Sequence, residues 1–223
     1  MYIALAACGS ARVGAPVPRP FPTPSTIPTD RASHALPETA ALWGGADFPR
    51  YLAMVEQVET GGDCLASPPA GSAIGCYQMT RAALVDAGLK DGAGDWLNNA
   101  WGIDSDDEFR SNRPAQDAAM LRYTTNNWLQ LEPCVRDLIG TTVGGVALDQ
   151  AALVAGAHLL GATGLVRFVR CGLQAHCISP DVAAWNGGVR HLHAIAIRRM
   201  RAAHGLRVLA PTAGSGSRCG LRG

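Results

Sequence analysis

The sequence predicts a mainly α-helical domain. Over residues 48–58 the apolar side chains recur at three- and four-residue steps, which is the stripe of an amphipathic helix. Helix start and stop signals follow at several later points, whereas strand signals are few. Hydrophobic residues make up 48% of the 223 residues, which is enough for a packed core without a partner chain.

The first half of the chain carries two helix signals. The stripe over 48–58 is followed by Gly61 and Gly62, which we expect to end the first helix as a C-terminal cap. After a proline-containing loop, residues 72–79 are short and extended. Thr80 is a suitable N-cap for a second helix that ends at Gly88, and residues 89–113 are expected to be irregular.

The second half carries further helix signals, each with its own start or stop residue. Pro114 stands at a favoured first position, Asp149 is a suitable N-cap, and Gly161 and Gly205 are stop signals. The expected helices span 114–131, 150–160, 164–169 and 189–204, with another start at 179–181. The last helix has one apolar face, formed by Val189, Leu192, Ala196 and Met200.

Composition divides the chain into four parts. Residues 1–8 resemble a truncated lipoprotein signal, and residues 9–39 are too rich in Pro, Ser, Thr and Ala to bury a core, so we expect a linker. Residues 40–210 form the folded domain, and the glycine- and serine-rich residues 211–223 are a flexible tail.

The charge balance and the length of the apolar runs argue against nucleic-acid binding and against a membrane span. There are 19 basic and 18 acidic side chains, a net charge of +1, and no basic run that would indicate nucleic-acid binding. No apolar run reaches the roughly 18 residues of a membrane span. We therefore expect no nucleic-acid partner and no transmembrane helix.

The seven cysteines predict disulfides and export. They contain no Cys-x-x-Cys zinc signature, and so many cysteines favour an oxidising compartment. Leu5-Ala6-Ala7-Cys8 matches a bacterial lipobox, so Cys8 is expected to carry lipid and to tether an outer-membrane lipoprotein through the linker. Six cysteines then remain. Of several connectivities, we expect the disulfides Cys64–Cys76, Cys171–Cys177 and Cys134–Cys219.

No metal or cofactor is expected. His191 and His193 lie on different sides of a helix and make a poor metal pair. His158 lies within an apolar helix and is interpreted as a core histidine. His176 next to Cys177 invites a thiol-enzyme or zinc interpretation, but a disulfide-bonded cysteine is neither a nucleophile nor a ligand.

Glu59 is the strongest catalytic candidate. At about 100° per residue it points along nearly the same line as Leu52, in the middle of the first helix's apolar stripe. We therefore expect a half-buried carboxyl group at the exposed end of a helix. Desolvation raises the pKa of such a group, which suits a general acid. Glu56 falls at the edge of the stripe and is interpreted as a surface or supporting residue.

Several motifs near Glu59 and beyond it match a known superfamily in order along the chain. They are Glu59-Thr60-Gly61-Gly62, Gly75-Cys76-Tyr77-Gln78-Met79-Thr80, residues 109–117, residues 157–164, and Ala184-Trp185-Asn186-Gly187-Gly188. Over residues 48–200 the chain resembles the lysozyme-like superfamily, in particular lytic transglycosylases and phage-type peptidoglycan hydrolases. The resemblance implies a lysozyme-like (soluble lytic transglycosylase-like) domain with a cleft, here braced by disulfides. Trp185 stands where the family motif has tyrosine.

The resemblance implies cleavage of the MurNAc–GlcNAc β-1,4 bond of peptidoglycan. Glu59 would protonate the leaving oxygen and then, as a base, take the proton of the sugar's 6-hydroxyl, giving 1,6-anhydro ends. A hydrolytic muramidase usually needs a second acid, and neither Asp63 nor Asp95 lies in a recognisable motif for one. Hydrolysis remains an alternative, as does a catalytically inactive peptidoglycan-binding scaffold.

The resemblance also implies a set of substrate-binding residues. Gln78 and Asn186 are expected to hydrogen-bond N-acetyl groups or hydroxyls, and Tyr77 and Trp185 to offer flat faces to sugar rings. Ser72 and Thr80 are expected to polarise Glu59 or the substrate. The implied location is the periplasm or cell envelope.

Overall fold

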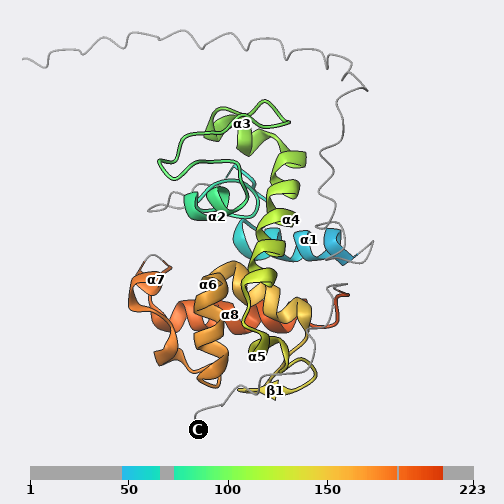
Figure 1. Cartoon of the computed structure of the whole chain (residues 1–223), viewed down its shortest axis with the longest axis vertical. Helices are drawn as coiled ribbons and strands as arrows, with labels where there is room; N and C mark the ends of the chain where they lie inside the picture. Colours follow the sequence, from blue (N-terminus) through green and yellow to red (C-terminus); the bar gives the residue numbers. More distant parts are fainter. Residues whose placement is uncertain (1–46, 66–72, 185, 208–223) are drawn as a thin grey trace, which may run out of the picture. The chain divides into compact units, whose positions relative to one another are not determined.

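The computed structural model describes residues 47–65, 73–184 and 186–207, and in these ranges the chain is mainly helical (Figure 1). The helices are α1 (Asp47–Glu59), α2 (Arg81–Asp86), α3 (Asp106–Ser111), α4 (Arg113–Gln130), α5 (Pro133–Arg136), α6 (Gln150–Arg170), the 3₁₀-helix η2 (Ala175–Cys177), α7 (Pro180–Ala184) and α8 (Val189–Ala203). The strands β1 (Thr142–Val143) and β2 (Val146–Ala147) form one antiparallel hairpin. The expected mainly α class is confirmed.

The helix boundaries follow the capping residues. Thr80 accepts a hydrogen bond from Ala83 N and begins α2, and Asp149 accepts one from Ala152 N and begins α6. Asn112 caps α4, and Pro114 is the second residue of that helix. Each side-chain oxygen satisfies one of the backbone N–H groups that a helix start leaves without a partner.

Four short segments differ from the expectation. Residues 89–113 are not wholly irregular, because Ser105 caps α3 by accepting from Glu108 N. Neither α5 nor the β1–β2 hairpin was expected, since two-residue strands are too short to show alternation. The extended segment expected over 72–79 is reduced, within the described residues, to a single antiparallel bridge between Ile74 and Met79.

The central element is α6, whose residues 151–158 are all buried. A helix buried on every side lies inside a core. α6 is long and apolar enough to cross a membrane, but 67% of its most apolar stretch is buried within the domain, as in a core helix. Gly161 has φ 69° and divides α6 into two segments, which matches the expected stop at this glycine.

The other helices bring α1 to the middle of the domain. α4 and α8 both pack on α6, α2 and α3 pack on α4, and α1 packs on α8. Figure 1 shows α4 running from α3 to α5, with α1 crossing between the part that contains α2 and α3 and the part that contains α6 and α8. The last residue of α1 is Glu59, so this packing places the candidate acid at the junction.

Candidate functional site

Glu59 lies beside two basic side chains from distant parts of the chain. Its side chain is 17% exposed, which confirms the expected half-burial at the end of α1. Arg199 of α8 donates a hydrogen bond from Nη2 to Glu59 Oε1 and forms an ion pair with it. His158 of α6 has its Nε2 3.9 Å from the same oxygen. Glu59, His158 and Arg199 are hereafter the acid cluster.

Neither Arg199 nor His158 was predicted from the sequence to lie at the site; His158 was interpreted as a core histidine, and Arg199 was not singled out. Arg199 is 2% exposed and lies on the buried face of α8 with Leu192, Ala196 and Ala203. Within the described residues its Nε and Nη1 atoms have no hydrogen-bond partner. Its Nη2 pairs with Glu59, and a buried arginine that lost this carboxylate would be costly to the fold.

Two opposing effects act on the Glu59 carboxyl group. Burial raises its pKa, and the charge and hydrogen bond of Arg199 lower it, with the net pKa above its ordinary value. Burial also lowers the pKa of His158 to about 3, with a further lowering from the Arg199 charge. His158 is consequently neutral at pH 7, and Glu59 is the group in the acid cluster whose pKa is raised.

A tight turn over residues 74–79 lies next to the acid cluster. Ile74 and Met79 exchange two backbone hydrogen bonds of 3.0 Å, and Gln78 Nε2 donates to Gly75 O at 2.9 Å. Gly75 has φ 77°, and a Cβ at this position would lie 2.5 Å from Gln116 Oε1. Glycine is therefore required both by the backbone conformation and by the close approach of α4.

This 74–79 turn is tied to α1 and to α4. Cys76 N donates to Gln116 Oε1 at 2.7 Å, and Cys76 is disulfide-bonded to Cys64, just after α1. Thr60 Oγ1 lies 3.4 Å from Cys76 O and can donate to it. The His158 ring also makes a hydrogen bond with the Tyr77 backbone. These contacts fix the turn relative to the end of α1, where Glu59 lies.

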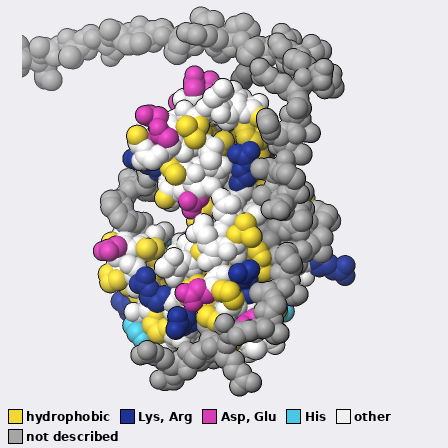
Figure 2. Space-filling view, in the orientation of Figure 1, with side chains coloured by type: hydrophobic (Ala, Val, Ile, Leu, Met, Phe, Trp, Pro, Cys, Tyr) yellow, Lys and Arg dark blue, Asp and Glu magenta, His cyan; other side chains and the backbone are white. Residues whose placement is uncertain are grey.

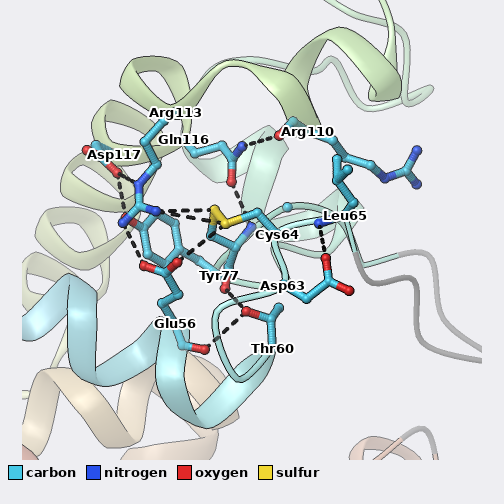
Figure 3. Close-up of a disulfide and its surroundings, with 12 residues drawn as sticks. Glu56, Thr60, Asp63, Cys64, Leu65, Tyr77, Arg110, Arg113, Gln116 and Asp117 are labelled. Carbon is cyan, nitrogen blue, oxygen red and sulfur yellow. Dashed lines mark hydrogen bonds and ion pairs between the residues drawn. A yellow bond between two sulfur atoms is a disulfide. The ribbon is translucent and has the colours of Figure 1, made fainter.

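A second cluster of charges reinforces the same junction (Figure 3). Arg113 donates from Nη2 to Glu56 Oε2 and from Nε to Asp117 Oδ1, both at 2.8 Å. Tyr77 donates to Asp117 Oδ1 at 2.5 Å, and the Arg113 guanidinium lies 5.1 Å from the Tyr77 ring centroid. Glu56 is thus held by Arg113 and supports the end of α1, as expected for a supporting residue.

The predicted binding residues differ in how accessible they are to a substrate. Tyr77 is fully buried, so its ring has no face open to a sugar, and its role is to hold the 74–79 turn. Gln78 is partly exposed on that turn, and Thr80 is exposed with its hydroxyl engaged in capping α2. Asn186 donates from Nδ2 to Val182 O at 2.7 Å. Ser72 and Trp185 lie outside the described residues.

No second buried acid accompanies Glu59 among the candidates from the sequence. Asp63 is exposed and accepts a hydrogen bond from Leu65 N at 3.1 Å, and Asp95 is exposed on the 91–95 loop. Figure 2 shows one face of the domain, hollowed between the part with α2 and α3 and the part with α6 and α7. Two surface pockets, one between α6 and α7 and one along α8, are not lined by Glu59.

The cysteines agree with two of the expected disulfides. Cys64–Cys76 and Cys171–Cys177 are both bonded, which confirms these pairs. The third expected pair, Cys134–Cys219, includes a residue outside the described ranges, as does the lipidation expected at Cys8.

The site therefore consists of one partly exposed carboxyl group with a raised pKa, one buried arginine, one neutral histidine and a rigid turn beside them. Such a set can donate a proton from Glu59 and then stabilise the resulting carboxylate through Arg199. Comparisons of the chain with protein-family models, with curated proteins and with solved structures gave no match.

Proposed function

We propose that the protein cleaves the glycan strands of peptidoglycan at the MurNAc–GlcNAc β-1,4 bond, with Glu59 as general acid and base. The observation that carries the proposal is the half-buried Glu59 carboxyl group with a raised pKa, at a helix end beside the 74–79 turn. Its motif context, which resembles the lysozyme-like superfamily, supplies the substrate class and a lysozyme-like domain with a cleft.

The proposed reaction uses Glu59 twice. Its proton goes to the glycosidic oxygen as the bond from that oxygen to C1 breaks, and positive charge develops on the sugar ring. The Glu59 carboxylate, now stabilised by Arg199, takes the proton of the 6-hydroxyl, whose oxygen bonds to C1. The product has a 1,6-anhydro ring, Glu59 is protonated again, and no water is consumed.

The surroundings of Glu59 support the transglycosylase over the hydrolase. Asp63 and Asp95 are exposed, whereas Glu56 is about as buried as Glu59, with its side chain 19% exposed against 17%. Glu56 is ion-paired with Arg113, which leaves Glu59 as the buried carboxyl group with a raised pKa. A reaction in which a single carboxyl group acts as acid and base fits this arrangement best. A hydrolytic muramidase with a second carboxylate is the alternative reaction on the same bond.

A second candidate function is a peptidoglycan-binding scaffold without catalysis. The observation that favours it is the ion pair between Glu59 and Arg199. This ion pair favours the deprotonated form of Glu59, whereas a general acid must carry a proton. In this case the protein would bind glycan strands and release no product.

The location that we propose is the periplasm or the cell envelope after export. Two bonded cysteine pairs support an oxidising compartment. The membrane tether through Cys8 remains a proposal on the lipobox alone.

Mass spectrometry of the products from purified peptidoglycan tests the proposed function. Wild-type protein, Glu59→Gln and the matched control Glu56→Gln are compared. We expect 1,6-anhydro-muramic ends from the wild type, substantial activity from Glu56→Gln, and at least about a hundredfold loss in Glu59→Gln, because general acid catalysis contributes about 10²–10⁴-fold.

Each other result has a definite meaning. Reducing ends in place of anhydro ends would establish the muramidase, and binding to glycan without soluble product would establish the scaffold. Equal losses in Glu59→Gln and Glu56→Gln, with both variants folded by circular dichroism, would contradict the assignment of Glu59.

A further inference from the structure

The loop after α6 brings two sulfur atoms and one imidazole nitrogen together, away from the acid cluster. Cys171 is the C-terminal cap of α6, and His176 and Cys177 belong to η2. Cys171 Sγ lies 3.5 Å from His176 Nε2, and these atoms and Cys177 Sγ all lie within 4.8 Å of one another. In the structure the two cysteines are joined as a disulfide, which leaves neither sulfur free to bind a cation.

The backbone holds this loop in place independently of the disulfide. Leu173 is buried, and its N–H donates to Phe168 O at 2.9 Å. The His193 ring nitrogen Nε2 lies 2.9 Å from Leu173 O, and Cys177 N donates to Gln174 O at 3.0 Å. Since these contacts do not involve sulfur, the two cysteines remain close together when the bond between them is opened.

We propose that, after reduction of Cys171–Cys177, the side chains of Cys171, His176 and Cys177 bind one Zn²⁺ ion, with the fourth position open to water. Zinc prefers thiolate and imidazole ligands in a tetrahedron. Bond lengths of about 2.3 Å to sulfur and about 2.0 Å to nitrogen give tetrahedral edges of about 3.5 Å between sulfur and nitrogen and about 3.8 Å between sulfurs. The distance of 3.5 Å between Cys171 Sγ and His176 Nε2 already matches the first edge.

The chemistry of the change is balanced by a reductant and a water molecule. A phosphine gives two electrons to the disulfide and becomes a phosphine oxide with the oxygen of one water, whose two protons go to the sulfurs. Zn²⁺ then binds the two sulfurs as thiolates and releases those two protons. The disulfide and the zinc site are therefore alternative states of the same three residues.

The other group of cysteine and acidic side chains does not compete for the ion. Glu56, Cys64 and Cys76 also lie close together, but Arg113 Nη1 is 3.4 Å from Cys76 Sγ and its Nη2 is ion-paired with Glu56. A cation at that position would face a guanidinium. Beside the 171–177 loop, in contrast, the charge of Arg170 is paired with Glu132 at 3.6 Å.

The sequence expectation of no metal site depended on the absence of a zinc spacing and on the disulfide expected at Cys177. Cys171 and Cys177 are six residues apart, with His176 next to the second cysteine, and this pattern matches no common zinc signature. The turn at Gly172 and Leu173, both with positive φ, folds the loop back and brings the three ligand atoms together.

Cobalt binding to the full chain tests the proposal. The protein is reduced with a phosphine under nitrogen, its thiols are counted, and Co²⁺ is titrated while the thiolate-to-cobalt charge-transfer band is recorded. We expect one tetrahedral Co²⁺ per chain, displaced by Zn²⁺. The band should be lost in Cys177→Ser, and binding should weaken at least about tenfold in His176→Ala, since even outer-shell changes cost about 10–100-fold.

The control is the double variant Cys64→Ser/Cys76→Ser, which should keep the band. Absence of the band after complete reduction of a protein that is still helical by circular dichroism would overturn the proposal. The proposal also fails if His176→Ala and Cys177→Ser bind cobalt as the wild type does, or if the control variant loses the band.

Discussion

Arg199 is a buried cation paired with Glu59, and it lowers the pKa of Glu59 against the larger, opposite effect of burial. Like Glu59, it is a charged residue within an apolar stripe, in line with Leu192, Ala196 and Ala203. The sequence predicts this face of the last helix correctly through Leu192 and Ala196, and the arginine inside the same face could have been noticed there. No sequence pattern, however, could show that Glu59 and Arg199 meet.

Replacing Arg199 with methionine should shift the pH dependence of peptidoglycan cleavage. Arg199 lowers the pKa of Glu59 against the effect of burial, so its loss raises that pKa further. The acid then stays protonated at higher pH, and the alkaline limb of kcat/KM against pH moves upward. The exposed neighbour Arg198→Met is the control and should leave the profile unchanged. An alkaline limb that moves downward in Arg199→Met would contradict the proposed effect of the arginine.

His158 should make the folded state less stable in mild acid. Its pKa falls from 6.5 in the unfolded chain to about 3 in the folded domain, so the folded state binds fewer protons. The contribution of His158 to the free energy of unfolding is fully present above pH 6.5. It is lost as the pH falls from 6.5 to 3. Between pH 7 and pH 5 this amounts to about 2 kcal/mol. Urea unfolding at both pH values should show this loss in the wild type.

The variant His158→Phe keeps a ring against Tyr123 and removes the titrating group. Between pH 7 and pH 5 the free energy of unfolding of this variant should fall by about 2 kcal/mol less than that of the wild type. An equal change in both proteins would mean that other groups, mainly carboxylates, account for the acid sensitivity.

At the scale of elements, the helices with a recognisable start or stop residue could be predicted, among them the short helices α2 and α7. α2 and α6 begin at the expected caps Thr80 and Asp149, because one side chain and one backbone N–H determine each start. α4 was expected to begin at Pro114, and it begins one residue earlier because Asn112 caps it. The signal for α3 was present as Ser105 and Glu108, a serine followed three residues later by a glutamate, but it lay among glycines and tryptophans. The 74–79 turn could not be derived, because it depends on α4.

Gly75→Ala tests how closely the 74–79 turn fits against α4. The new Cβ would lie 2.5 Å from Gln116 Oε1 at a φ of 77°, so the variant loses both the backbone conformation and the hydrogen bond to Cys76 N. We expect a loss of about 2–4 kcal/mol in the free energy of unfolding. Gly62→Ala is the matched control: φ is 96° there, and nothing lies within 4 Å of the added Cβ.

The control variant isolates the cost of positive φ, about 1–2 kcal/mol. Chemical denaturation of both variants gives the comparison. If Gly75→Ala is no less stable than Gly62→Ala, the turn moves freely away from Gln116, and the rigid support inferred for the site is wrong.

At the scale of the whole molecule, the two described disulfides should differ in their effect on function. Cys64–Cys76 joins the residues after Glu59 to the 74–79 turn, whereas Cys171–Cys177 closes a loop after α6. Each closes a short loop and should contribute about 2–3 kcal/mol to stability. The double variant Cys64→Ser/Cys76→Ser should also lose activity by about tenfold or more, because small displacements of a catalytic group are costly.

The double variant Cys171→Ser/Cys177→Ser provides the comparison. It should melt at a lower temperature than the wild type but keep its activity on peptidoglycan at about 25 °C. Activity and thermal unfolding are measured on the same preparations. Unchanged activity in Cys64→Ser/Cys76→Ser would show that the disulfide near the acid cluster has no part in positioning it.

The ion pair between Glu59 and Arg199 has a consequence for timing. Its two residues are 140 positions apart, and Arg199 belongs to the last helix that the structure describes. In a chain that is still being synthesised, or that crosses a membrane unfolded, Glu59 therefore lacks its ion pair with Arg199. The proposed catalytic centre is complete only when α8 has docked, so we expect no wall-cleaving activity from the chain before the whole domain has folded.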